Sequence, residues 1–113
     1  LRGSEDDADV GLAALEAVAA LSEGMPSNQH AMRQAGACEV LVTTLQVLSR
    51  DAPPVRVAAV HAIAAVSDGL TANQNAMRRA GACEALVCFM RAYGRDLVMN
   101  PRTLRSTRRS SSA

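Results

Sequence analysis

Three cysteines, two histidines and a repeated glutamate are the residues that could do chemistry in this chain of 113 residues. Cys38 and Cys83 both follow a Gly-Ala pair, and a thiol in the first turn of a helix can have a lowered pKa and become reactive. Because the same residue stands at the same place twice, a small packing residue is the simpler interpretation. Cys83 and Cys88 are five positions apart, unlike the short pair spacing of a zinc site. We therefore predict no metal site and no cofactor.

Carboxylates and histidines are the other candidates for catalysis. Glu39 and Glu84 repeat, but an acid at the start of a helix is expected because it offsets the positive end of the helix dipole. His30 and His61 are not matched by a second histidine in the other copy. The chain has no Gly-rich phosphate loop, no H-E-x-x-H and no G-x-S-x-G motif. We predict that the chain is not an enzyme and has no catalytic residues.

The composition excludes several further classes. Apolar residues make up 49% of the chain and aromatic residues only 2%, which argues against a disordered chain and against a base-stacking surface for specific nucleic-acid binding. No uncharged apolar run approaches the ~18 residues that cross a bilayer, so we expect no membrane span. Three cysteines form no self-contained disulfide framework. We therefore expect an intracellular protein, and favour the cytoplasm over the nucleus.

An internal repeat must position all of these residues. Residues 12–51 match residues 57–96 at a constant offset of 45, without a gap and with 21 identities in 40 positions. Such a period is typical of helical repeat proteins, in which each unit buries its apolar face against its neighbour. The repeat, rather than any single motif, is the strongest signal in the sequence.

Each unit predicts three helices. A short first helix begins at Asn28 or Asn73, since an Asn side chain can cap an orphan backbone N–H, and it ends at Gly36 or Gly81. The second helix follows directly, and its later copy is expected to end at Gly94. The third helices are Ala-rich and each ends at a Gly; the Asp51-Ala52-Pro53-Pro54 break precedes the later one. The predicted second helices are 37–49 and 82–93, and the predicted third helices are 10–23 and 55–68.

This order of helices at this period resembles the armadillo repeat. The likeness is carried by Asn28…Ala35-Gly36-Ala37…Leu41-Val42…Leu45, by Asn73…Ala80-Gly81-Ala82…Leu86-Val87…Met90, and by the third helices that end in Gly24 and Gly69. The resemblance implies an all-α, right-handed superhelical solenoid segment of about two three-helix repeats. It also implies a concave groove, lined by the third helices, for protein partners.

The resemblance divides the chain into three parts. Residues 1–9 are an acidic, polar N-terminal extension, in which residues 1–4 could be cloning residues. Residues 10–95 are the armadillo segment. Residues 96–113 are an Arg- and Ser-rich tail or linker without a fold of its own. Within the armadillo segment we expect a third helix at 10–24, a full repeat at 28–69, and first and second helices at 73–94.

The candidate binding residues lie on the third helices. In peptide-binding armadillo proteins this helix carries a Trp and, four residues later, an Asn. Neither residue is present here, which argues against the peptide clamp of those relatives. The same face presents a shallow, mildly acidic surface that fits a partner segment containing Arg or Lys; a plain solvated helix face is the alternative. The candidate protein-binding residues are Glu16, Ala20, Glu23, His61, Ala65 and Asp68.

The tail carries a separate candidate. Arg108-Arg109-Ser110-Ser111 resembles a basophilic-kinase site, where phosphate would reverse the local charge at Ser110 or Ser111. A plain solubilising tail or inter-domain linker is the alternative.

The sequence therefore favours a non-catalytic protein–protein interaction scaffold that uses a helical-repeat surface, as a fragment of a longer armadillo array. The alternative is an architectural element that joins subunits of a large assembly through its solenoid ends and tail, without binding a peptide in the groove. Two units fall short of the three or so that usually make a stable array. We therefore expect further repeats in the parent chain, or end-to-end association with another copy.

Overall fold

Six α-helices account for the regular structure of this computed structural model, which describes residues 4–47 and 53–99 and the side chains of residues 9–47 and 54–92. No strand occurs within those ranges, which confirms the all-α class. In chain order the helices are α1 (Ser4–Ser22), α2 (Pro26–Gln34), α3 (Ala37–Val47), α4 (Pro53–Ser67), α5 (Thr71–Ala80) and α6 (Ala82–Met99).

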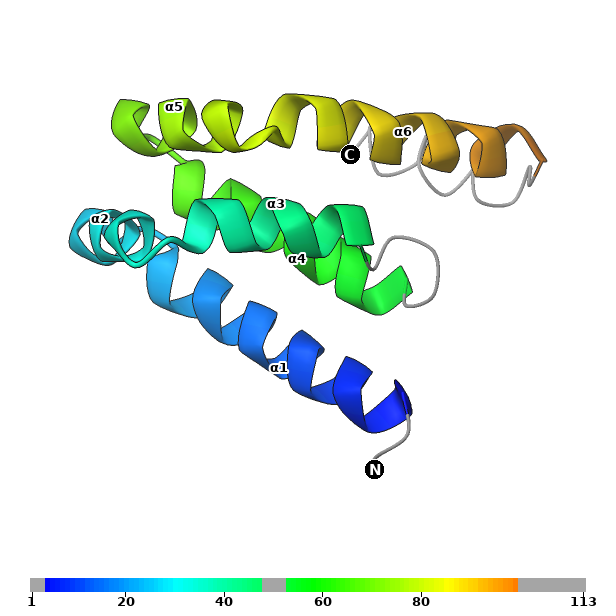
Figure 1. The fold of residues 1–113 in the computed structure, drawn as a ribbon, viewed down its shortest axis with the longest axis horizontal. Helices are drawn as coiled ribbons and strands as arrows, with labels where there is room; N and C mark the ends of the chain where they lie inside the picture. The colour runs from blue at the N-terminus through cyan, green and yellow to red at the C-terminus, as the bar shows by residue number, and fades with distance from the viewer. Residues whose placement is uncertain (1–3, 48–52, 100–113) are drawn as a thin grey trace, which may run out of the picture.

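The helices stack in the order of the sequence repeat (Figure 1). α1 lies along α4, α3 and α4 form the middle of the molecule, and α5 and α6 continue on the side away from α1. α2, α3 and α4 together make the first unit (residues 28–69 of the repeat), and α5 and α6 repeat α2 and α3. The core runs through this stack, and its most deeply buried members are Cys38, Val42, Leu45, Val55, Ala59, Ala62 and Val66.

Alanine explains how α1 and α4 approach each other so closely. Their contact is the most extensive between any two helices of the described chain. Ala59 and Ala62 on α4 are completely buried, and Ala19 on α1 is nearly so. A methyl side chain allows two helix axes to come near without steric overlap. The Ala-rich, aromatic-poor composition is thus a consequence of close helix packing.

Glycine and proline break the chain where the repeat predicts. Gly36 and Gly81 have φ angles of 90° and 97°, a left-handed conformation in which a side chain would be strained. At these two positions the short helix ends and the chain turns directly into the next helix. Pro53 begins α4, as expected for a residue that is tolerated in the first helical turn.

Two predicted helix boundaries are wrong. α1 begins at Ser4, whereas the sequence predicts a polar extension up to residue 9. Glu5, Asp6 and Asp7 favour this start, because acidic residues are stabilising in the first turn of a helix. α6 continues through Gly94 to Met99, since a single Gly lowers helix stability by only ~1 kcal/mol.

The predicted caps of α2 and α5 are also wrong. Met25 and Leu70 occupy the N-cap positions, and neither makes a side-chain cap hydrogen bond. Asn28 and Asn73 lie inside the first turn of their helices. Each side chain donates a hydrogen bond to a carbonyl seven residues earlier in the chain. Asn28 Nδ2 donates to Leu21 O at 2.7 Å, and Asn73 Nδ2 donates to Val66 O at 2.8 Å. Both carbonyls belong to the end of the preceding helix, where they have no partner within the helix.

A small polar seam joins the two units. Gln29 of α2 is 2% exposed, and its Nε2 donates to Ala65 O and Asp68 O at 2.8 Å each. Asn73 of α5 is completely buried and donates to Gln29 O at 2.8 Å. Arg33 Nε donates to Asn73 Oδ1 at 2.9 Å. Because buried amides are costly to leave unpaired, this seam sets the register of α5 on the first unit.

Candidate functional site

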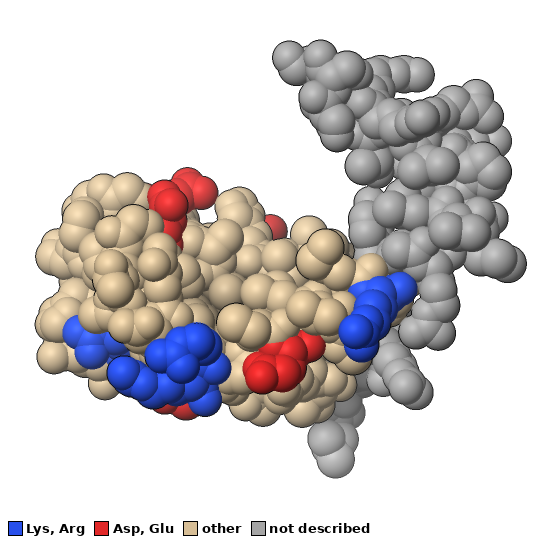
Figure 2. Space-filling view, turned by 90° about the horizontal axis from the view of Figure 1, so that it is seen from above, with Lys and Arg blue, Asp and Glu red and all other residues tan. Residues whose placement is uncertain are grey.

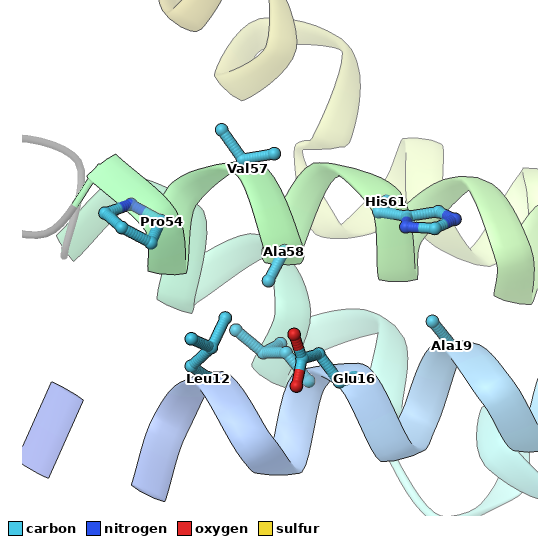
Figure 3. A pocket seen from close by; sticks show the side chains of 8 residues that line it. Leu12, Glu16, Ala19, Pro54, Val57, Ala58 and His61 are labelled. Carbon is cyan, nitrogen blue, oxygen red and sulfur yellow. The ribbon is translucent and has the colours of Figure 1, made fainter. Parts of the chain in front are cut away.

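An open pocket lies between α1 and α4, the two helices that the repeat makes equivalent. Its volume is about 510 Å³. In Figure 3, Leu12 and Glu16 of α1 face Ala58 of α4 across the space between the helices. The pocket is lined by Leu12, Leu15, Glu16, Ala19, Pro54, Val57, Ala58 and His61. Its walls are largely apolar, with one carboxylate and one imidazole among them.

The structure brings several of the predicted groove residues together at this pocket. Glu16 and His61 line it directly. Glu23 lies beside His61, with 3.4 Å between Glu23 Oε2 and His61 Nε2. Both side chains are well exposed, so this contact is a weak, solvent-screened one. The edge of the pocket therefore carries two carboxylates next to a histidine.

The remaining groove candidates behave differently from one another. Ala20 and Asp68 are exposed and do not line the pocket, whereas Ala65 is 5% exposed. Ala65 lies under α2, where its carbonyl accepts the hydrogen bond from Gln29. The sequence predicts that Ala65 lies on the open face, whereas in the structure Ala65 is buried beneath α2. Ala20 is the equivalent of Ala65 on α1. It is exposed because, in the described chain, no helix lies over α1 as α2 lies over α4.

The apolar wall of the pocket was missed by the sequence reasoning. Val57 is 61% exposed and, with Leu12, Pro54 and Ala58, it supplies most of the surface that a ligand would contact. Leu12 and Val57 stand four residues before Glu16 and His61, on the same helical face one turn earlier. This i−4 spacing was the signal in the sequence that could have identified them.

The two repeated cysteines are in different surroundings. Cys38 is buried, and burial together with the neighbouring Glu39 carboxylate raises the pKa of its thiol, while Arg33 opposes the shift. Cys83 and Cys88 are exposed, and all three thiols are free. Cys38 is thus the packing residue that the sequence predicts, whereas its equivalent Cys83 lies on the surface of this chain.

Basic side chains gather at the end of the molecule that α2 and α5 form (Figure 2). Arg33 lies in the last turn of α2, and Arg78 and Arg79 lie in the last turn of α5. Cations are stabilising there because the C-terminus of a helix carries partial negative charge. Arg33 is also held by Asn73 and by His30 Nδ1, 2.6 Å from its Nη2, so this group has a structural explanation.

Within the described ranges, no three His, Cys, Asp or Glu side chains lie close enough together to hold a metal ion. In the same part of the chain, no helix combines the length and apolar character that a membrane crossing requires. The candidate modification sites Ser110 and Ser111, and most of the predicted tail at 96–113, lie outside the described residues.

Comparison with known proteins adds no relative: the chain matches no family model, and no curated protein or solved structure is significantly similar to it. Its function must therefore be argued from its own surfaces.

Proposed function

We propose that this chain is a non-catalytic protein-interaction scaffold, a segment of an armadillo-type array, and that the pocket between α1 and α4 receives a segment of a protein partner. The order of a short helix, a left-handed Gly and two longer helices supports the armadillo assignment. The observation that carries the function is the open pocket itself, which combines an apolar wall with acidic side chains at its edge.

The chemistry of the pocket suggests what such a segment contains. An apolar side chain of the partner that packs against Leu12, Val57 and Ala58 would be removed from water. Burying one leucine side chain in this way contributes ~2 kcal/mol to the binding free energy. Glu16 and Glu23 lie where an Arg or Lys beside that apolar residue would meet a carboxylate. Exposed ion pairs contribute little to affinity, so the apolar contact should supply most of the binding energy and the charges should supply orientation.

The proposal is tested with fluorescein-labelled peptides in which a central Leu stands between two Arg residues. We expect fluorescence anisotropy to show saturable binding to the intact chain. Val57→Glu should weaken binding by at least tenfold, because one apolar contact of ~1.4 kcal/mol corresponds to that factor. Glu39→Lys is the matched control, since Glu39 is exposed on α3 and outside the pocket.

The charged edge is tested separately. Replacing Glu16, Glu23 and His61 together by Gln should abolish the preference for the Arg-flanked peptide over one with Ser in place of Arg. Equal binding by the Val57→Glu chain, or no saturable binding by the intact chain, would contradict the proposal.

A second candidate function is that of an architectural element that joins subunits through the solenoid ends and the tail. The observation that favours it is the exposure of apolar residues at both ends of the stack, including Val10, Leu21 and Met90. If partner capture survives the triple substitution in the groove and is lost when residues 97–113 are deleted, this candidate is favoured. An intracellular, cytoplasmic site of action remains part of the proposal and rests on the cysteine content.

A further inference from the structure

The N-terminal end of the stack exposes a helix face that the repeat buries elsewhere. Val10 of α1 is 70% exposed, whereas its equivalent Val55 of α4 is 2% exposed. Leu21 is likewise exposed, whereas its equivalent Val66 is completely buried. We call this surface the α1–α3 end face; its members are Val10, Ala14, Ala17 and Leu21 of α1 and Val40 of α3, and all five are exposed. Their equivalents Val55, Ala59, Ala62, Val66 and Ala85 are all buried.

The opposite end exposes the surface that normally receives such a face. A groove of about 330 Å³ opens between α4, α5 and α6, and nearly all of its wall is apolar. Met90, which follows the lining residue Leu86 by one turn of α6, is 66% exposed, whereas its equivalent Leu45 is 1% exposed. We call this surface the α4–α6 end face; its members are Val60, Ala64, Gln74, Arg78, Cys83 and Met90. In the first unit the equivalent groove of α1, α2 and α3 is filled by α4.

The polar seam is incomplete at the same two ends. Gln29 donates two hydrogen bonds into the end of α4, but its equivalent Gln74 is exposed and makes none within the described residues. Asn73 makes three hydrogen bonds, whereas its equivalent Asn28 makes only the bond to Leu21 O in the described part of the chain. Arg78 is exposed and lacks the amide partner that Arg33 has in Asn73.

We propose that the chain associates head to tail: the α4–α6 end face of one copy receives the α1–α3 end face of a second copy, in the geometry with which successive units pack within the chain. α1 of the second copy would then lie in the groove of α4, α5 and α6, as α4 lies in the groove of α1, α2 and α3. This proposal concerns the two ends of the stack and is independent of the partner pocket between α1 and α4.

The docked geometry assigns a partner to each unpaired group. Gln74 Nε2 donates to Ala20 O and Glu23 O of the second copy, as Gln29 does to Ala65 O and Asp68 O. Asn28 Nδ2 of the second copy donates to Gln74 O. Arg78 Nε donates to Asn28 Oδ1 of the second copy, as Arg33 Nε does to Asn73 Oδ1.

A second copy is the occupant that fits, because α1 repeats the sequence of the helix that the groove receives. Residues 12–24 and 57–69 share seven identities in 13 positions, among them the final Ser and Gly. The residues that follow residue 99 do not continue the Ala-rich pattern; residues 102–113 contain four Arg and four Ser. One chain therefore carries both halves of a single interface, at opposite ends. Such an interface does not close on two copies and extends into a filament or a ring.

The decisive experiment uses two variants that each block one end. Ala17→Glu places a carboxylate where the equivalent Ala62 is completely buried, and Met90→Glu does the same where Leu45 is buried. Both positions are exposed in the single chain, so circular dichroism should show an unchanged helix content. Analytical ultracentrifugation of the intact chain up to about 1 mM, where a contact with a Kd of ~10⁻⁴ M is populated, should show species that grow with concentration.

Each blocked variant alone should remain a monomer, and an equimolar mixture should form a dimer that does not grow further. The mixture forms because each variant keeps the end that the other has lost. Ala72→Glu is the matched control: Ala72 is exposed, and its equivalent Ser27 stays exposed although the next unit packs on the first, so this variant should associate like the intact chain. A monomeric intact chain, a symmetric dimer that the mixture does not restore, or association that survives Ala17→Glu would overturn the proposal.

Thiol alkylation with N-ethylmaleimide gives an independent readout. Cys83 lies in the groove, and its equivalent Cys38 is 1% exposed under α4. Cys88 is exposed, and its equivalent Thr43 is also exposed. We expect Cys83 alkylation to slow at least fivefold as concentration rises, while Cys88 alkylation stays constant. Equal rates at all concentrations would show that no partner covers the groove.

Discussion

The two repeat units place identical residue types in opposite surroundings. Cys38 and Cys83 follow the same Gly-Ala pair, yet the first is buried and the second is exposed. Gln29 and Gln74 differ in the same way. In each pair the buried residue is the one over which α4 packs. The comparison teaches that burial in a stacked array is set by the neighbouring unit, so that one sequence pattern is a core in one place and a surface in another.

The largest difference should come from truncating an equivalent pair of apolar side chains. Leu45→Ala should lower the free energy of unfolding by about 3 kcal/mol, because it leaves a cavity in the core. Met90→Ala should lower it by less than about 0.5 kcal/mol, since Met90 is largely exposed. Urea denaturation at low protein concentration measures both values. Equal losses at the two positions would contradict the burial difference.

The amide pair should give the next largest effect. Asn73→Ala removes three hydrogen bonds at a completely buried position and leaves the Val66 carbonyl at the end of α4 without its side-chain donor. We expect a loss of about 2–3 kcal/mol. Asn28→Ala removes the single bond to Leu21 O and should cost ~1 kcal/mol or less. The ratio of the two losses, measured by thermal or urea unfolding, reports the energy of the polar seam between units.

The cysteine pair should differ in pH dependence rather than in size of effect. Burial raises the pKa of the Cys38 thiol, so the folded state favours the protonated thiol. Its contribution to stability is present below the ordinary thiol pKa of ~8.5 and is lost as pH rises through the raised value. Cys38→Ala should therefore flatten the fall in the free energy of unfolding above about pH 8.5. A slope that is as steep in Cys38→Ala as in the intact chain would refute the assignment.

The smallest difference should come from the serine pair. Ser22 is completely buried, and its Oγ has no hydrogen-bond partner among the described residues, whereas Ser67 Oγ donates to Ile63 O at 2.7 Å. Ser22→Ala should be neutral or stabilise the fold by up to ~1 kcal/mol, because it removes an unpaired buried hydroxyl. Ser67→Ala should cost about 0.5 kcal/mol. Differential scanning calorimetry resolves the sign, and a clear loss of stability in Ser22→Ala would show that this hydroxyl is paired in solution.

Sequence reasoning predicted the elements well wherever a strong local signal exists. Gly36, Gly81 and Pro53 break the chain as expected, because left-handed φ angles and the missing proline N–H act through the backbone itself. The predicted helix boundaries are wrong where the local sequence signal for a helix end is weak. Gly94 does not end α6, since no competing structure stops the helix there, and the acidic residues before residue 9 begin α1 instead of forming an extension.

The candidate site was predicted in part. Glu16 and His61 were found because they occupy the positions that the armadillo resemblance assigns to partner binding. The apolar wall at Leu12 and Val57 was not found, because an exposed valine and a core valine look alike in a sequence. Ala65 was placed on the open face, yet the carboxamide of Gln29 and the helix that carries it cover this residue.

By itself the sequence determined the repeat, the all-α class and the residues that break the chain, because these depend on periodicity and on local backbone chemistry. Only the tertiary structure decided which copy of each residue is core, seam or surface. Burial and hydrogen bonding depend on what lies next to a helix, and in a stacked array that neighbour comes from residues about 45 positions away. The same sequence repeat thus accounts for a closed core at α4 and for the open faces at both ends.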